Sequence, residues 1–88
     1  MHAVLVSVKI DDFDQARKAL REQVIPRVKQ TPGFVAGYWF EPQGDQGWST
    51  VLFESEEAAR AAAERIREGA PEQVTVQNVD VRGVVEHA

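Results

Sequence analysis

The stretch from Gly33 to Ser55 constrains the fold of this chain more than any other part. Two runs rich in aromatic and β-branched residues flank a polar segment, Pro42–Gly47, whose proline and glycines are typical of a turn. This pattern predicts two strands joined as a hairpin, with the second strand at about Trp48–Glu54. Because side chains alternate between the faces of a strand, large apolar residues at odd and even positions make both faces apolar. The sheet that contains this hairpin therefore needs cover on two sides.

A strand followed by a helix is predicted ahead of the hairpin. The run Ala3–Ile10 is valine-rich and alternates strictly, so its valines share one face of a strand with Ile10. Asp12 is predicted as a helix N-cap, and apolar residues then recur at helical spacing to about Gln30. Pro26 removes one backbone hydrogen bond in the last third of this helix, so we expect a kink there.

A second helix and a final strand are predicted after the hairpin. Ser55 is the expected N-cap of this helix, and Gly69 is expected to end it. The last strand is predicted over about Val74–Glu86. Its apolar residues change parity between Val76 and Val79, which is the change that a β-bulge produces.

The order strand–helix–strand–strand–helix–strand predicts one α+β domain over residues 1–88 with a ferredoxin-like βαββαβ fold. Two right-handed crossovers give a four-stranded antiparallel sheet with both helices on one face. The other face is polar in a monomer, yet here Leu5 and residues of the hairpin make it apolar. An exposed apolar patch of this kind marks an interface or a binding groove. We therefore predict a homodimer whose two sheets pack face to face.

Composition and charge exclude several classes of protein. The chain has no cysteine, so disulfides and thiolate metal sites are excluded. Its net charge of −4 argues against a nucleic-acid partner, because a basic surface is the expected footprint of such a protein. No segment approaches the ~20 apolar residues of a membrane helix, and the apolar start lacks the basic leader of a signal peptide. We expect a cytoplasmic protein with no membrane partner.

Five segments of the chain carry a resemblance to known proteins. They are a valine-rich first strand, the segment Val28–Phe34 (VKQTPGF), the aromatic second strand, the segment Val51–Ala59 (VLFESEEAA) and a valine-rich last strand. Together they resemble the dimeric α+β barrel superfamily, and within it the small antibiotic-biosynthesis-monooxygenase-like domains. The resemblance covers essentially the whole chain, and it extends to small proteins of actinobacterial type.

The resemblance implies a dimer with a cavity between sheet and helices, and it leaves two functions open. One is a cofactor-independent monooxygenase-like enzyme acting on a small aromatic or polyketide-like compound. The other is a non-enzymatic homodimeric module that binds a small ligand or simply assembles. The haem-degrading branch of the family uses a histidine on the second helix, whereas residues Glu56–Glu68 contain none. Haem degradation is therefore not expected, and the predicted function uses no cofactor.

The aromatic hairpin provides a candidate ligand pocket, in which the Tyr38 hydroxyl or a tryptophan N–H would orient an apolar ligand. Seven residues are candidates: Phe34, Tyr38, Trp39, Phe40, Trp48, Thr50 and Leu52. If Phe40 pairs with Trp48, all of these except Trp39 share one face with Glu54, and a slip of one residue exchanges the set. The alternative is that these residues form the core or the dimer interface.

No catalytic set is identifiable from the sequence. There is no Gly-rich phosphate loop, no Ser/His/Asp arrangement and no zinc spacing. His2 and His87 lie near the same end of the sheet if the last strand pairs with the first, with Glu86 close by. A metal site of two histidines and one carboxylate is then conceivable. Solvated terminal residues are the alternative that we favour, so no metal site is predicted.

Overall fold

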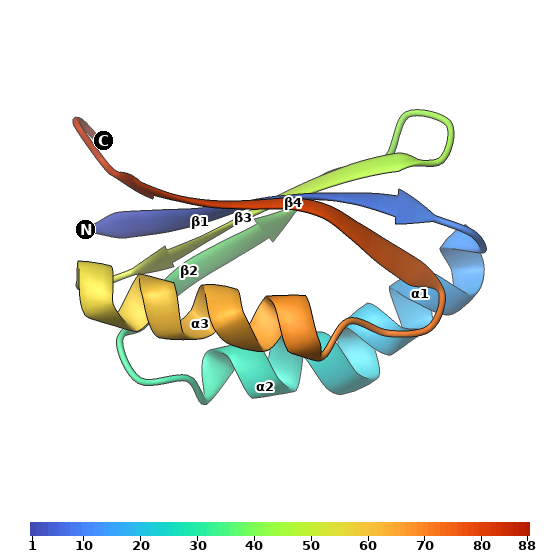
Figure 1. Ribbon diagram of the computed structural model, residues 1–88, viewed down its shortest axis with the longest axis horizontal. Helices are drawn as coiled ribbons and strands as arrows, with labels where there is room; N and C mark the ends of the chain where they lie inside the picture. Colours follow the sequence, from blue (N-terminus) through green and yellow to red (C-terminus); the bar gives the residue numbers. More distant parts are fainter.

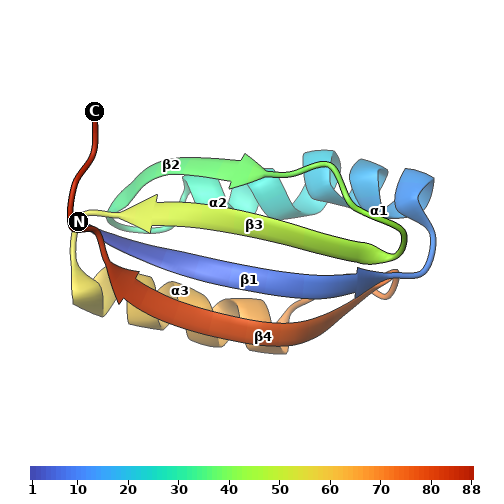
Figure 2. The same ribbon diagram turned by 90° about the horizontal axis from the view of Figure 1, so that it is seen from above.

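The computed structural model describes residues 1–88, all as one chain of alternating strands and helices. The elements are β1 (His2–Ile10), α1 (Phe13–Ala19), the π-helical turn η1 (Leu20–Val24), α2 (Ile25–Lys29), β2 (Phe34–Trp39), β3 (Gln46–Phe53), α3 (Glu56–Glu68) and β4 (Val74–Gly83). The strands form one antiparallel sheet in the order β2-β3-β1-β4, and the helices all cover the same face of it (Figure 1 and Figure 2). The predicted ferredoxin-like fold is confirmed. No helix is long and apolar enough to cross a membrane.

The core lies between the sheet and α3. Val4 of β1 pairs with Val51 of β3, so their side chains lie together on the face that meets the helices. These two valines and Phe53 are the largest fully buried side chains. Three alanines of α3 are buried against them: Ala59, Ala62 and Ala63. Their small side chains allow this helix to lie close to the sheet.

The connection between β1 and β2 is one helical stretch whose type changes just before Pro26. Asp12 caps its start, because Asp12 Oδ1 accepts a hydrogen bond from the Gln15 N–H at 3.2 Å. In η1, directly before the proline, the Ile25 N–H donates to the Leu20 carbonyl five residues back. The wider turn accommodates the proline ring, which in a regular helix clashes with the carbonyl four residues before it. The helix therefore accommodates Pro26 through a π-helical turn, and the expected kink stays a prediction.

A β-bulge in β4 accounts for the change of parity along this strand. Asn78 pairs with Ser7, but the next pair is Val76 with Val8, which leaves Gln77 as the extra residue. The extra residue returns the valines on both sides of the bulge to the face that meets the helices. The bulge predicted in the last strand is confirmed.

A second bulge lies at the start of β2 and corrects one prediction. Phe34 pairs with Phe53 and Ala36 pairs with Leu52, so Val35 is the extra residue. Phe34 therefore packs on the helix side, edge-on against Phe53 with ring centroids 6.4 Å apart. Strict alternation placed Phe34 on the opposite face, and this was wrong because alternation does not allow for the extra residue of a bulge.

The face of the sheet that no helix covers is largely apolar over β1, β2 and β3. The Phe40 N–H donates to the Trp48 carbonyl at 3.0 Å, and Tyr38 pairs with Thr50, so Phe40 lies opposite Trp48 at the turn end of the hairpin. Four large side chains are exposed on this face: Leu5 (40%), Tyr38 (56%), Phe40 (55%) and Trp48 (43%). We call this surface the open face. One chain alone leaves it uncovered.

Candidate functional site

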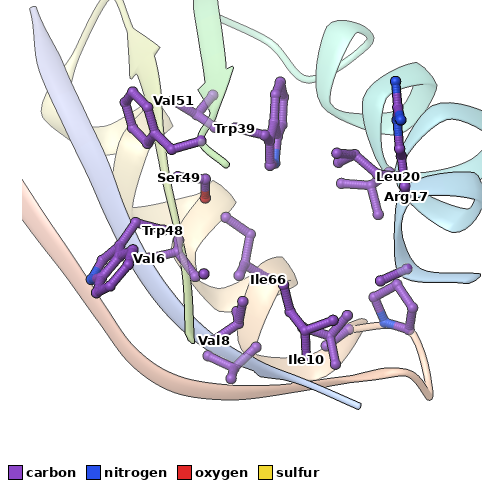
Figure 3. A pocket seen from close by; sticks show the side chains of 18 of the residues that line it. Val6, Val8, Ile10, Arg17, Leu20, Trp39, Trp48, Ser49, Val51 and Ile66 are labelled. Carbon is purple, nitrogen blue, oxygen red and sulfur yellow. The ribbon is translucent and has the colours of Figure 1, made fainter. Parts of the chain in front are cut away.

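A cavity of about 300 Å³ lies between the sheet and the first helical segment (Figure 3). β1 contributes Val6, Val8 and Ile10 to its lining, and the helices contribute Leu20 and Ile66. Of its 22 lining residues 16 are hydrophobic, so the cavity suits a mostly apolar molecule.

The cavity exists because the helices lie at different distances from the sheet. α3 packs directly on β1, β3 and β4 through its buried alanines. η1 and α2 present larger side chains to the cavity, namely Leu20, Val24 and Val28, and the segment α1–η1–α2 approaches no strand as closely as α3 does. Large side chains hold a helix backbone away from a sheet, and here they leave space that they do not fill.

Trp39, the last residue of β2, forms one wall of the cavity. A Cβ atom on Gly37 would lie 2.7 Å from Trp39 Cη2 and 2.8 Å from Cζ3, so the indole lies directly against the glycine. Figure 3 shows the ring between Ser49 and Leu20, with its nitrogen toward the cavity. The Trp39 N–H donates no hydrogen bond within the protein. It is therefore available to a ligand.

Ser49 pairs with Trp39 across the two antiparallel strands. It lines the same cavity, and its hydroxyl forms no hydrogen bond within the protein. Cβ atoms of directly paired residues are about 4.5–5.5 Å apart. The indole N–H and the serine O–H are thus two free donors, from directly paired residues, in a mainly apolar cavity. Such a pair can hold a single ligand oxygen, for example that of a hydroxyl or keto group.

Charged groups stand only at the rim of the cavity. Arg17 of α1 and Glu41, just beyond β2, both line the cavity and are exposed, and neither forms an ion pair within the protein. The lining contains no histidine, cysteine, methionine or tyrosine. No group of three His, Cys, Asp or Glu side chains is placed to hold a metal ion. The cavity can therefore bind and orient a molecule through apolar contact and two donors.

The structure places the seven sequence-predicted pocket residues at the cavity, on the open face and in the core, and Phe40 and Trp48 belong to both of the first two places. Three of them line the cavity: Trp39, Phe40 and Trp48. The Trp48 indole itself points away from the cavity (Figure 3). Three others lie on the open face: Tyr38, Thr50 and Leu52. Phe34 packs against Phe53 in the core. Ligand contact by these residues stays a prediction.

Sequence reasoning did not find Ser49, Arg17 or Leu20 as cavity residues. Ser49 left a signal, because it is the single polar side chain on a strand face that otherwise holds Gly47, Val51 and a buried phenylalanine. Arg17 and Leu20 gave no such signal in the sequence, since their distance from the sheet depends on how the helices pack.

The two histidines lie apart from the cavity. His2 Nε2 is 3.8 Å from Glu56 Oε2 at the start of α3, and its ring Nδ1 is buried without a hydrogen-bond partner. His87 is exposed in the segment after β4. The conceivable site of two histidines and one carboxylate is not assembled.

Comparison with known proteins gives matches of structure and none of sequence. No protein-family model matches the chain, and no curated protein sequence matches it. The haem-degrading protein MhuD of Mycobacterium tuberculosis has a similar structure. In a variant with two manganese protoporphyrin IX molecules bound per active site it is 16% identical with a TM-score of 0.75, covering 100% of this chain and 98% of MhuD.

Two further structures have the same architecture. A dimeric ferredoxin-like protein from an uncultured marine organism is 10% identical with a TM-score of 0.64, over 100% of this chain and 98% of that one. The second RRM domain of the yeast poly(U)-binding protein is 16% identical with a TM-score of 0.61, over 99% of this chain and 100% of that one. Because proteins with such different ligands share the architecture, similarity at this level of identity shows the fold alone. The chain has the ferredoxin-like fold.

Proposed function

We propose that this protein binds a small, flat, mostly apolar molecule in the cavity between its sheet and the segment α1–η1–α2. The observation that carries the proposal is the paired donors, Trp39 N–H and Ser49 O–H, in a cavity that is otherwise mainly apolar. Ligand sites are typically apolar cavities of this kind with a few convergent polar groups that fix orientation. A ligand with an apolar ring system and one hydroxyl or keto oxygen matches both the apolar lining and the two donors.

The residues of the cavity do not fit haem held by a protein ligand to the iron. Haem proteins coordinate iron through histidine, cysteine, methionine or tyrosine side chains, and the lining has none of these. α3 contains no histidine, and His2 lies beside Glu56 outside the cavity. MhuD binds porphyrins in its active site, so the structural similarity to it supports a ligand-binding role, without supporting haem degradation in this chain.

A more specific hypothesis is that the same site has an enzymatic role in addition to ligand binding. The two free donors can stabilise negative charge that develops on a bound phenol-type or keto oxygen, as donors do in oxyanion sites. This favours cofactor-independent, monooxygenase-like chemistry on an aromatic or polyketide-like compound, with dioxygen as co-substrate. The alternative is a binding module without activity. Oxygen uptake in the presence of a bound phenolic ligand separates the two.

We further propose that the protein functions as a homodimer that buries the open face. Apolar patches on this scale mark interfaces in soluble proteins, and Leu5, Tyr38 and Trp48 are all exposed there. A domain of 88 residues buries only roughly 60–65% of the surface of its unfolded chain, so a partner subunit adds needed apolar burial. The similarity to a dimeric ferredoxin-like protein supports this assembly.

Calorimetric titration with a neutral probe tests the proposed function. Naphthylbutanol has a flat apolar body and one hydroxyl, and we expect saturable binding of one molecule per chain. Leu20→Trp adds bulk at the cavity lining, so it should weaken binding at least tenfold, which corresponds to about 1.4 kcal/mol. Val35→Trp is the matched control, because Val35 is exposed and lines neither described cavity. Equal affinity in the wild type and Leu20→Trp, or no binding at all, contradicts the proposal.

A further inference from the structure

A second cavity of about 360 Å³ opens between α2 and α3, next to the first. Its inner part is apolar, with Val28 of α2 and Ile66 of α3 packed against the core that contains Phe53. Two arginines also line it, Arg27 from α2 and Arg65 from α3, and both are exposed. We call this site the arginine groove. It combines an apolar interior with positive charge at the surface.

The two arginines of the groove have no carboxylate partner in the protein. Of the other five arginines, Arg60, Arg67 and Arg82 form ion pairs with Glu56, Glu64 and Asp80, and Arg17 and Arg21 form none. A protein with a net charge of −4 has ample carboxylates to pair with exposed arginines. The positive charges of Arg27 on α2 and Arg65 on α3 are therefore not neutralised by a carboxylate of the protein. Together they make the groove complementary to an anion.

The position of the Arg27 guanidinium supports this assignment. Its Nη1 lies 3.8 Å from the point where a Cβ on Gly69 would be, so the side chain extends from α2 to the end of α3. Part of this placement is explained by the partial negative charge at the C-terminus of α3. A helix end satisfies little of the bonding capacity of a guanidinium, which has five N–H donors in a planar fork. The fork remains free for a carboxylate, its best geometric match.

The groove and the first cavity share one wall. Five residues line both: Val24, Val28, Val51, Ile66 and Gly69. A molecule with its ring system in the first cavity therefore lies one layer of side chains away from Arg27 and Arg65. A ligand that reaches both cavities has to cross this layer between α2 and α3, and a short aliphatic chain is the part of it suited to do so.

We propose that the ligand of this protein is an apolar carboxylic acid, with its ring body in the cavity and its carboxylate bound by Arg27 and Arg65 in the groove. The inference rests on the proposed function, and it adds the chemical class of the ligand. It also assigns the two arginines a role in selecting acids over neutral molecules of the same shape.

A matched pair of probes tests the inference by calorimetry. Naphthylbutanoic acid and naphthylbutanol share one body and differ only at the end group. Because hydrogen bonds to charged groups are worth more than neutral ones, the wild type should bind the acid about tenfold or more tighter than the alcohol. Raising the salt concentration should weaken binding of the acid and leave that of the alcohol unchanged, because salt screens exposed charges.

Substitutions of the arginines locate the effect. In Arg27→Gln/Arg65→Gln the acid should lose its advantage of about tenfold, while the affinity for the alcohol stays the same. The control is Arg21→Gln/Arg60→Gln, which removes the same charge from exposed positions outside the groove and should keep the preference. Equal binding of acid and alcohol by the wild type overturns the inference and leaves the proposed function standing. The same holds if the control loses its preference for the acid as much as Arg27→Gln/Arg65→Gln does. If neither probe binds to the wild type, the proposed function fails, and the inference with it. The salt series on the wild type keeps the test valid if a variant does not fold.

Discussion

Replacing Phe53 with alanine is expected to lower the free energy of unfolding by about 3–5 kcal/mol, the usual cost of truncating a buried phenylalanine. Phe53 is 1% exposed and stands in the middle of the core, with Phe34 edge-on against it. The loss includes the aromatic pair, which is worth about 0.5–1.5 kcal/mol. Small domains have a total stability of about 5–15 kcal/mol, so this one change removes a large part of it.

Thermal and urea unfolding followed by circular dichroism measure this effect. For a domain of this size we expect the melting temperature of Phe53→Ala to fall by about 15–30 °C. Phe13→Ala is the matched control, because Phe13 is 47% exposed at the start of α1 and its loss should cost about 1 kcal/mol or less. A similar fall for both variants would mean that the core is not centred on Phe53.

Replacing Leu5 with lysine is expected to convert the homodimer into a monomer. Leu5 lies in the central strand and is 40% exposed on the open face. In a face-to-face dimer with twofold symmetry each substitution occurs twice, and each buried, unpaired charge costs about 2 kcal/mol or more. The dissociation constant of the dimer should therefore rise by about 1,000-fold or more. The single chain tolerates the change, because Leu5 is exposed on the open face and a lysine there keeps its ammonium group in water.

Light scattering at micromolar concentration measures the expected change in mass. The wild type should have the mass of two chains, and Leu5→Lys that of one chain, 9.8 kDa. Ala61→Lys is the control, because Ala61 is exposed on α3 on the other side of the molecule, and its dimer should persist. A wild-type protein that scatters as a single chain contradicts the dimer directly.

The fold could be predicted from the alternation of apolar residues, because burial of one face against the helices fixes the register of the strands. The strict alternation in β1 is preserved because this strand is central and buries one side of the sheet against helices. The change of parity in β4 marked its bulge for the same reason, since valines must return to the buried face. At the start of β2 the sequence is apolar at successive positions, Phe34 and Val35, so alternation gave no sign of the bulge there.

The candidate site was less predictable than the fold. Three of the pocket residues predicted in the hairpin line the cavity, but the apolar pattern does not distinguish a wall of a cavity from a packed core or an interface. The cavity arises because α3 packs through alanines whereas η1 and α2 carry larger residues, which sets two different distances to one sheet. The arginine groove depends on the same packing, since it joins Arg27 and Arg65 from helices far apart in sequence.

The indole N–H resonance of Trp39 gives the most direct test of the account. In a two-dimensional ¹H–¹⁵N spectrum the protein has two such resonances, from Trp39 and Trp48, and Trp39→Phe assigns them. On titration with naphthylbutanol the Trp39 resonance should shift saturably, because its N–H faces the cavity and has no partner in the protein. The Trp48 resonance should change little, because its indole points away from the cavity. A Trp39 resonance that stays unchanged up to saturating probe, or a shift of Trp48 alone, would contradict ligand binding in this cavity.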